Sequence, residues 1–351
     1  MNARVTFIGE PIMDVLCPLD HWPQLGDKAT FSSLARIPGG TIANMAVAAR
    51  CSTADVALIG FLKDCPDSGT LLDDLNSCGI DTSLITQIAD GVEPVCLVFI
   101  TEGSNAVIYP DRQSETVTLD EQALERISTS TILCSTPEKI RRVRNNDQLA
   151  QAISSMQVSD GRFVIDADTG AEFDPTDPIL STANILIVNE FGVRRCFATS
   201  WDDIRNGMSL LTSEHKDATL PPILIVTGAE KGAWVYTRET DSWEHRPAIP
   251  THVVDPTGAG DAFVGTLVAE LALDKPLGSA LDSAIRSGAQ AVSTKGARLP
   301  LPSREHASAI PRNGRYARGV RTPPTLGRRG SSQARGRQSS ARGTNPRRPA
   351  Q

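Results

Sequence analysis

The sequence predicts an α/β fold in which a mostly parallel central sheet is flanked by helices and accompanied by a small separate β sheet. Short apolar, β-branched runs alternate along the chain with helical patterns, and this order is typical of parallel sheets covered on both faces. Two stretches, Lys28–Arg36 and Pro94–Tyr109, contain strand-like runs without helices. We therefore expect them to form a separate small sheet, with a hairpin turn at Glu102–Asn105.

The elements of the central sheet follow one another in a regular order. The expected strands are Val5–Gly9, Asp55–Gly60, Thr131–Cys134, Phe163–Asp166, Ile185–Val188, Ile223–Thr227 and Thr251–Asp255. Thr41–Arg50 is Ala-rich and helix-like, and Asp67–Cys78 carries leucines at helical spacing, with Gly79 where a helix would end. Ligands of such sheets bind beyond the carboxyl ends of the strands, so we expect the functional site there.

The composition is that of a chain that can bury a substantial core. Hydrophobic residues make up 40% of the 351 residues, and no apolar run reaches the roughly 18 residues of a membrane span. The opening MNARVTFIGEPIMDV has no signal-peptide pattern. Seven cysteines are scattered without metal-binding or CxxC spacing. We therefore expect reduced, partly buried thiols, a cytoplasmic location and no membrane contact.

Charge divides the chain at residue 311. Residues 312–351 hold eleven arginines and no Asp, Glu or Lys, while the whole chain carries a formal net charge of −6, so residues 1–311 carry −17. An acidic body suits an enzyme better than a nucleic-acid-binding core. The tail is rich in Gly, Pro and Ser and is expected to be disordered. It is either a dispensable extension, which we favour, or a contact for RNA, DNA or acidic lipid.

A glycine-rich turn, DPTGAGDAF, runs from Asp255 to Phe263 and carries the main functional signal. A helix is expected to begin near Gly258, because apolar residues recur at every fourth position from Phe263 onward. The first N–H groups of a helix have no partner within it, and the helix dipole favours negative charge at that end. Small residues let an anion approach this backbone, so the turn predicts a phosphate site.

Asp261 stands in the first turn of this helix, beside an anion that it would repel. A carboxylate in that place can accept a proton from a substrate hydroxyl while the backbone holds the phosphoryl group. The alternative is that Asp261 only caps the helix. The sequence contains no GxxxxGK[ST] motif, so the loop is not of the Walker type.

Several motifs together resemble the ribokinase-like, or PfkB, carbohydrate kinase family. DPTGAGDAF is similar to the family's DTxGAGD signature, and PGGTIANMAVAA, which begins at Pro38, is similar to its substrate-side pattern. LIGFLKDCPDSG with LLDDLNSCGIDTS resembles the next block, VNEF the NxxE region and IVTGAEKGAWV the nucleotide strand VTxGxxG. The resemblance covers about residues 3–302 in the family's order. It favours a kinase far more strongly than the loop alone.

The resemblance implies an α/β kinase domain over residues 1–311, with lid strands within about residues 11–38 and 92–112. Such kinases move the γ-phosphate of ATP to a hydroxymethyl group of a sugar or sugar-like substrate with Mg²⁺, often aided by K⁺. Lid strands of the family often pair between subunits, which makes a homodimer the expected assembly.

The resemblance also assigns roles to residues of this chain. Asp261 becomes the general base, and the anion hole would be formed by Gly258, Ala259 and Gly260. The substrate positions are Asp14, Gly39, Gly40 and Asn44. The nucleotide positions are Asn189, Thr227, Gly228 and Gly232. A monovalent cation would be held by the loop of Asp255 and Thr257.

The chain departs from the family pattern at a few positions. The NxxE motif places Glu where this chain has Gly192, and Glu190 is one candidate to replace it. The middle glycine of VTxGxxG is Ala229, so a reshaped ATP loop is expected, and Thr266 replaces a glycine of the helix. Val164–Phe173 lacks the DxNxR of many fructokinase and ketodeoxygluconate kinase relatives, which counts against those two specificities.

Other interpretations of these residues stay open. Asp14 could be a turn residue and Asn44 a helix cap. Gly192 and Ala229 motivate a second hypothesis, a non-catalytic sugar or nucleoside sensor of the same fold. The acceptor also stays open among ribose, fructose, another sugar and a nucleoside, because fold-level likeness does not choose between them.

Overall fold

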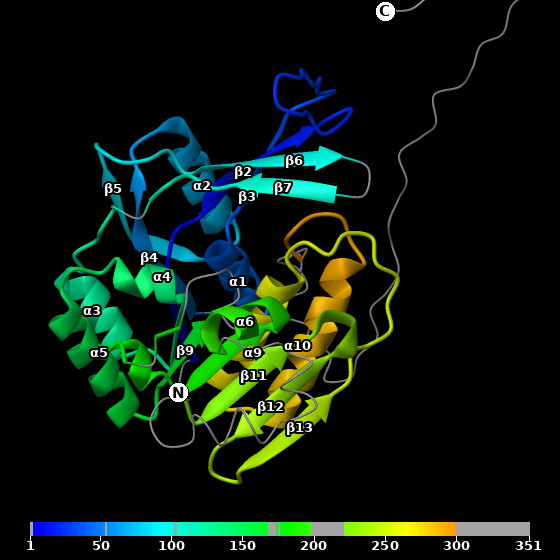
Figure 1. Cartoon of the computed structure of the whole chain (residues 1–351). Coiled ribbons are helices and arrows are strands. Elements are labelled where there is room, and N and C mark those ends of the chain that lie inside the picture. Colours follow the sequence, from blue (N-terminus) through cyan, green and yellow to red (C-terminus); the bar gives the residue numbers. More distant parts are fainter. Residues whose placement is uncertain are drawn as a thin grey trace, which may run out of the picture. The chain divides into compact units, whose positions relative to one another are not determined.

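Two sheets carry the fold in the residues that the computed structural model describes, which are 3–52, 55–101, 104–112, 114–167, 173–174, 176–197 and 221–299. The large sheet has the strand order β13-β12-β11-β10-β9-β8-β1-β4-β5, and the small sheet has the order β3-β2-β6-β7 (Figure 1). The expectation of a disordered tail at residues 312–351 lies outside the described residues.

The large sheet is parallel from β5 through β11, and β12 and β13 add to it in the antiparallel sense. Its strands are β1 (Arg4–Ile8), β4 (Asp55–Lys63), β5 (Asp81–Ile88), β8 (Ile132–Ser135), β9 (Arg162–Asp166), β10 (Ile185–Asn189), β11 (Ile223–Thr227), β12 (Ala233–Thr237) and β13 (Ser242–Arg246). The predicted α/β class with a mostly parallel sheet is confirmed.

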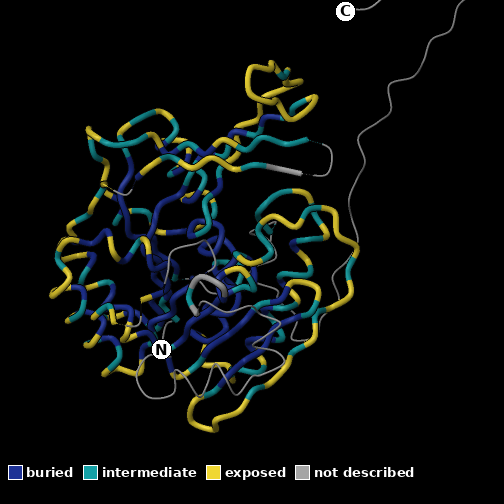
Figure 2. The backbone as a smooth tube through the Cα atoms, viewed as in Figure 1, coloured by how far each residue is buried: buried dark blue, intermediate teal, exposed yellow. Residues whose placement is uncertain are grey.

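Both faces of the large sheet are covered, as the run of apolar residues in its strands requires. Along β10, Ile185 and Ile187 pack in one core with helices α1, α9 and α10, while Leu186 and Val188 pack in a second core with α3 and α5. In Figure 2 the buried residues include the middle strands of the large sheet, β8, β9 and β10. The helices are α1 (Thr41–Arg50), α2 (Pro66–Ser77), α3 (Glu121–Ser128), α4 (Pro137–Arg141), α5 (Asn146–Val158), α6 (Glu190–Phe197), α9 (Ala259–Ala272) and α10 (Leu277–Val292).

Two of these helices, α1 and α9, lie unusually close together. Helix α1 is buried from Ile42 to Ala49, which its Ala-rich, uncharged sequence allows. In α9 the backbone of Gly265 lies against α1, so that a Cβ atom there would be 2.2 Å from the carbonyl oxygen of Met45. The close packing fixes the N-terminal ends of the two helices relative to each other.

The small sheet is the expected lid, built from β2 (Ile12–Pro18), β3 (Ala35–Gly39), β6 (Val95–Thr101) and β7 (Ser104–Ile108). The predicted hairpin is present, since β6 and β7 pair in the antiparallel sense from Leu97 with Ile108 to Thr101 with Ser104. Residues 102–103, between the two strands, lie outside the described residues.

The prediction of a strand over Lys28–Arg36 is wrong in its bounds. The strand begins at Ala35 and continues to Gly39, where it pairs with β2. Residues before it form a loop, because the carboxylate of Asp20 accepts hydrogen bonds from the backbone N–H and the hydroxyl of Thr30, both at 2.9 Å. This local bonding replaces a strand ladder.

The prediction of a strand over Thr251–Asp255 is also wrong. The segment joins no sheet, and Val253 and Val254 are more than half exposed. The backbone N–H groups of Val254 and Asp255 donate instead to one carbonyl oxygen, that of Val292 at the end of α10, at 2.7 and 3.2 Å. The β-branched pair thus follows the end of a helix and leads directly into α9.

The seven cysteines all lie in the described residues and none of them forms a disulfide, and three of them, Cys17, Cys96 and Cys134, are buried. Among the helices of the described residues, none combines the length and the apolar character that crossing a membrane would need.

Candidate active site

The predicted site residues gather beyond the carboxyl ends of the parallel strands and under the lid. Asn189 ends β10 and Thr227 ends β11, while Asp14 and Gly39 come from the lid strands β2 and β3. Open α/β sheets place their ligand sites at this edge. The fold therefore brings together substrate and nucleotide positions that are far apart in the sequence.

Asp14 lies directly over the backbone of Gly39. A Cβ atom on Gly39 would be 2.1 Å from a carboxylate oxygen of Asp14, so any other residue there would displace this side chain. Burial raises the pKa of Asp14 to about 6, although the nearby Arg298 guanidinium and a hydrogen bond with Cys96 act to lower it. The half-buried carboxyl group thus sits where an acceptor hydroxyl could bind it.

Gly40 and Asn44 form the N-terminal end of α1. Gly40 precedes the helix with φ +94°, and a Cβ atom there would approach the backbone nitrogen of Ile12 to 2.9 Å, so the position needs glycine. Asn44 is not the residue that caps α1, since that position is Gly40. Its side chain is buried in the first turn and points to another helix.

The N-terminal end of α9 is formed by the glycine-rich turn. Gly258 precedes the helix in the left-handed region at φ +78°, and a Cβ atom there would be 2.0 Å from the carbonyl oxygen of Ala297. Gly260 is exposed, whereas Gly258 and Ala259 are half-buried. The first N–H groups of the helix therefore stand at the surface, where an anion can reach them.

Asn44 and Asp261 join the two halves of the site. The Asn44 Nδ2 group donates to the Asp261 Oδ2 atom at 2.8 Å, across 217 positions of sequence. Asp261 is not the N-cap of α9, because Gly258 occupies that position. Its carboxylate faces the N-terminal end of α1, so the predicted base lies between the predicted substrate positions and the glycine-rich turn.

Arg298 belongs to this site, and our sequence analysis did not include it. Its Nε–H donates to the Asn44 Oδ1 atom at 2.8 Å, its Nη1 pairs with Asp74 of α2, and its Nη2 approaches the carbonyl oxygen of Gly39 at 3.5 Å. The partners lie 224 to 259 positions away in sequence. The only available signal was an arginine after the KGA near the end of the family-like region.

Asn189 and Thr227 face each other as register neighbours on β10 and β11. The Asn189 Oδ1 atom accepts a hydrogen bond from the Gly192 N–H at 2.6 Å and so caps the start of α6. The Thr227 hydroxyl donates to the carbonyl oxygen of Val188 at 3.4 Å. Both side chains are only half-buried and lie at the carboxyl ends of their strands.

Gly192 cannot be replaced by the family's glutamate without a shift of the backbone. A Cβ atom there would be 2.8 Å from the carbonyl oxygen of Ala167. The carboxylate of Glu190, the candidate to replace that glutamate, pairs with Lys231 at 2.6 Å on the neighbouring turn. No group of three or more His, Cys, Asp or Glu residues in the described ranges could hold a metal ion.

Comparison with known proteins decides the family. A family model for pfkB family carbohydrate kinases matches residues 2–304 of this chain. The chain belongs to the pfkB family of carbohydrate kinases. Its fold is that of a ribokinase from Arabidopsis thaliana solved with ribose and ATP, at a TM-score of 0.73 and 19% identity over 85% of this chain and 95% of that chain.

Two curated relatives of this kinase have different names. The chain is 27% identical over 301 residues to an ATP-dependent ribose-1-phosphate kinase from Halopiger xanaduensis. The aligned region covers 84% of this chain and 94% of the relative. It is 25% identical over 320 residues to a fructokinase from Klebsiella pneumoniae. That aligned region covers 87% of this chain and 98% of the fructokinase. The expected kinase class is confirmed, and the likeness does not choose the acceptor.

The backbone of the VTxGxxG turn of this kinase has positive φ angles at Gly232 and also at Ala229. Gly228 N–H donates to the carbonyl oxygen of Gly232 at 2.8 Å, which closes the turn. Gly232 has φ +93° and no room for a Cβ atom, which would be 2.1 Å from the carbonyl oxygen of Arg246. Ala229 itself adopts φ +47°, a left-handed conformation that costs a residue with a Cβ atom about 1–2 kcal/mol.

The loop before the glycine-rich turn of the kinase is held by Asp255. Its two carboxylate oxygens accept hydrogen bonds from the N–H groups of Thr257 and Gly296, both at 3.0 Å. Burial alone would raise the pKa of Asp255, but these hydrogen bonds outweigh it and hold the pKa below its ordinary value. The ionised carboxylate of Asp255 and the hydroxyl-bearing Thr257 are the groups that the family likeness predicts for a monovalent cation.

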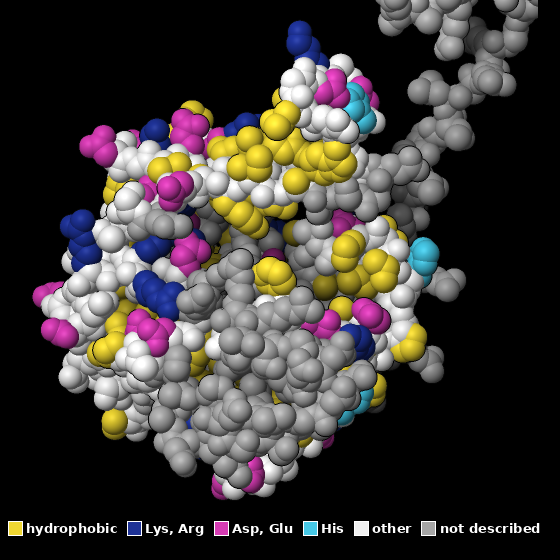
Figure 3. All heavy atoms as spheres, viewed as in Figure 1, with side chains coloured by type: hydrophobic (Ala, Val, Ile, Leu, Met, Phe, Trp, Pro, Cys, Tyr) yellow, Lys and Arg dark blue, Asp and Glu magenta, His cyan; other side chains and the backbone are white. Residues whose placement is uncertain are grey.

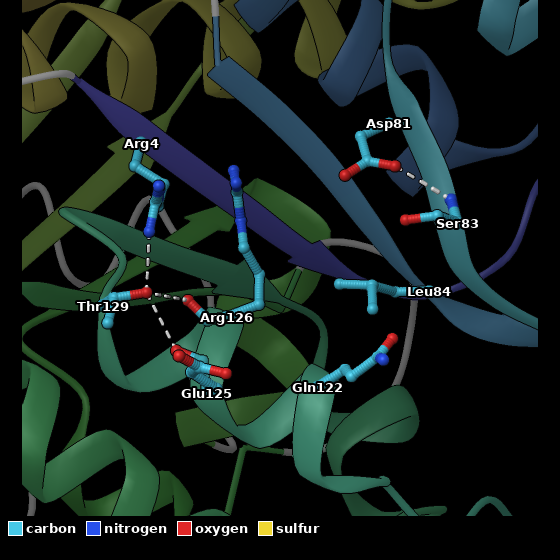
Figure 4. A pocket seen from close by; sticks show the side chains of 8 residues that line it. All are labelled: Arg4, Asp81, Ser83, Leu84, Gln122, Glu125, Arg126 and Thr129. Carbon is cyan, nitrogen blue, oxygen red and sulfur yellow. Dashed lines mark hydrogen bonds between the residues drawn. The ribbon is translucent and has the colours of Figure 1, made fainter.

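A surface cavity of about 270 Å³ lies at the opposite ends of the strands from this site (Figure 4). Arg4 begins β1 and Asp81 begins β5, so the cavity is at the amino ends of the strands. Arg4 and Arg126 both pair with Asp55 there, at 3.0 and 2.6 Å. These ion pairs support the sheet edge and are remote from the phosphate turn.

Proposed function

We propose that this kinase transfers the γ-phosphate of ATP to a hydroxymethyl group of a sugar or sugar-like acceptor, with Asp261 as general base. The observation that carries the proposal is the 2.8 Å hydrogen bond between Asn44 and Asp261. It fixes a carboxylate at the junction of two helix N-terminal ends, one under the lid and one in the glycine-rich turn. A general base and an anion site must be neighbours for phosphoryl transfer.

The reaction would proceed by direct displacement. Asp14 and Asn44 hold hydroxyl groups of the acceptor, and Gly39 and Gly40 let its ring approach the backbone. As the acceptor oxygen forms its bond to the γ-phosphorus, Asp261 takes the hydroxyl proton and the bond from the γ-phosphorus to the ADP oxygen breaks. The N–H groups of Gly258, Ala259 and Gly260 stabilise the negative charge on the transferred phosphoryl group.

Nucleotide and ions would occupy the neighbouring strand ends. ATP would lie along Asn189, Thr227, Gly228 and Gly232. When bound, Mg²⁺ would neutralise charge on the phosphates. Because the chain offers no carboxylate at position 192, we expect the ion to be held mainly by phosphate oxygens and water. A monovalent cation, K⁺ by family likeness, would use Asp255 and the loop of Thr257.

The relatives support a sugar as the acceptor class. They are named for ribose 1-phosphate and fructose, and the solved structure holds ribose. The experiment is an ADP-release screen with ATP, Mg²⁺ and K⁺ over D-ribose, 2-deoxy-D-ribose, D-fructose, ribose 1-phosphate and nucleosides. We expect turnover with one sugar, and loss of about two to four orders of magnitude in Asp261→Ala.

The control for this screen is Asp73→Ala, which removes an exposed carboxylate from α2 and should keep full turnover. Near-normal turnover in Asp261→Ala would reject the base. Binding of a sugar or nucleoside without any ADP release would favour the second candidate, a non-catalytic sensor. Gly192 and the strained Ala229 are the observations that favour that candidate.

We also propose that the lid forms a homodimer. Leu97 of β6 and Ile108 of β7 are register partners on one face, and they are 39% and 55% exposed. Figure 3 shows hydrophobic side chains gathered over the lid. Exposed apolar side chains that adjoin one another are typical of protein interfaces, and the family likeness makes a second copy of this chain the occupant.

A further inference from the structure

Arg298 lies on the side of Asn44 that faces away from Asp261. Its guanidinium contacts three groups from three elements: the Asn44 side chain on α1, the Asp74 carboxylate on α2 and the Gly39 carbonyl on β3. The side chain is only 16% exposed. With each nitrogen directed to a protein group, this guanidinium is placed to support other side chains rather than to hold a ligand.

The contact with Arg298 decides which way the Asn44 amide points. A guanidinium carries only donors, whereas an asparagine amide has one acceptor oxygen and one NH₂ donor. The Nε–H of Arg298 therefore selects the Asn44 Oδ1 atom, at 2.8 Å. The NH₂ group is then directed to the Asp261 carboxylate, also at 2.8 Å. In the flipped orientation two oxygens would face each other without a proton.

Asp74 completes the chain of contacts. It pairs with Arg298 and is itself 29% exposed, so the pair is partly shielded from solvent. A hydrogen bond from a neutral amide to an ionised carboxylate stabilises the charged form of that carboxylate. A chain of hydrogen bonds thus runs from α2 to the base. Arg298 donates to Asp74 and to Asn44, and Asn44 donates to Asp261.

We propose that Arg298, anchored by Asp74, is a positioning residue that holds the Asn44 amide in the orientation that donates to Asp261. The proposal rests on the role of Asp261 as general base given above. Arg298 acts through Asn44, so its removal should matter only while Asn44 is present. It should also alter the pH at which the base becomes active, because the base loses a hydrogen-bond donor.

The test uses Arg298→Met, which keeps the length of the side chain and removes its donors. With ATP and the best acceptor of the sugar panel, we expect kcat to fall about tenfold to hundredfold while the KM for ATP is unchanged. The acid limb of the kcat/KM profile should move up by about one pH unit. Because the Arg298 guanidinium also lowers the pKa of Asp14, this limb reports both carboxyl groups, and the Asp261 signal described below separates the base from Asp14. Arg298→Lys should recover part of the loss, and Asp74→Asn should show a smaller loss of the same kind.

A double-mutant cycle with Asn44→Ala separates positioning from general damage. In the Asn44→Ala background, Arg298→Met should add little further loss of kcat, since residues that act through each other are not additive. Arg126→Met is the matched control, because Arg126 is also paired with a carboxylate and is 13% exposed. It lies at the amino ends of the strands, opposite to the site. It should leave kcat and the acid limb unchanged.

A second readout needs no acceptor. The ¹³C signal of the Asp261 carboxyl group, assigned by its loss in Asp261→Asn, is titrated in the full chain. Its midpoint should rise by about one pH unit in Arg298→Met and should not move between Asn44→Ala and the double variant. Additive losses of kcat, or an unmoved midpoint, would overturn the positioning role. Full activity of Asp261→Ala would instead overturn the proposed base, which is a separate result.

Discussion

Asp14 holds a carboxyl group where its ionised form is costly. Its pKa is about 6 in the folded chain, mainly because burial disfavours the charge, against an ordinary value of 3.8. A raised carboxyl pKa means that folding favours the protonated form. The stability from this group is therefore fully present below about pH 4 and is lost as the pH rises through about 6. Above that pH, the ligand-free protein carries the cost of a partly buried charge.

We predict that Asp14→Asn makes the ligand-free protein more stable at pH 8, and that the advantage fades as the pH falls below 6. Urea unfolding of both proteins from pH 5 to 8 measures the difference. Asp255→Asn should instead make the protein less stable at neutral pH, because hydrogen bonds lower the pKa of Asp255 and stabilise its charge. A pH-independent difference for Asp14→Asn would contradict the assignment. The KM for the acceptor should rise in the same variant.

Ala229 is the second residue whose conformation makes a prediction. At φ +47° it adopts a backbone region that favours glycine, in the turn that precedes β12. Ala229→Gly should raise the free energy of unfolding by up to about 1 kcal/mol, because the relief of backbone strain exceeds the extra freedom of glycine in the unfolded chain. Thermal unfolding measures this. Ala152→Gly, inside α5, is the control and should lose about 1 kcal/mol.

Helices α1 and α9 show how an element-level contact controls the site. Gly265 of α9 lies against the backbone of Met45, so Gly265→Ala must push the two helices apart. We predict a loss of about 1–3 kcal/mol in the free energy of unfolding, as for other overpacked positions, together with a lower kcat because Asn44 and Asp261 separate. Chemical denaturation and turnover are measured together.

Gly288 of α10 offers the matched control for this prediction. A Cβ atom there would meet its nearest neighbour, the carbonyl oxygen of Ala259, at an ordinary 3.4 Å. Gly288→Ala should therefore be neutral or stabilising by about 0.4–1 kcal/mol, with normal kcat. Equal effects of the two substitutions would mean that helix propensity, rather than the contact between α1 and α9, decides the outcome.

Local pattern predicted the elements well where periodicity and burial agree. Thr41–Arg50 and Ile223–Thr227 have the predicted bounds, because an uncharged Ala-rich run and a β-branched run between turns leave little choice. Thr251–Asp255 has the composition of a strand, yet its partner is a helix end, and Asp20 folds the segment before β3 into a loop. In both cases one long-range or side-chain contact overrides local propensity, and sequence periodicity does not contain it.

At the scale of the whole molecule, the site is assembled from residues 14 to 298. Motifs predicted its main groups, because glycines and an aspartate at fixed spacing carry chemical meaning. Arg298 carries no such local pattern. Its importance comes only from folding, which brings α1, α2, the lid and the end of the kinase domain together around one guanidinium.

The assembly of the molecule gives the last prediction. If Leu97 and Ile108 are covered by a second copy, Leu97→Glu should separate the dimer, because a buried unpaired charge is costly. We expect the mass from light scattering to fall from that of two chains to that of one. Val158→Glu is the control, since Val158 is 84% exposed on α5, away from the lid, and its change should leave the mass unaltered. A wild-type mass of one chain would reject the lid interface, and an unchanged dimer in Leu97→Glu would place the interface elsewhere. Since the lid strand β2 carries Asp14, separation should also raise the KM for the acceptor more than it changes the KM for ATP.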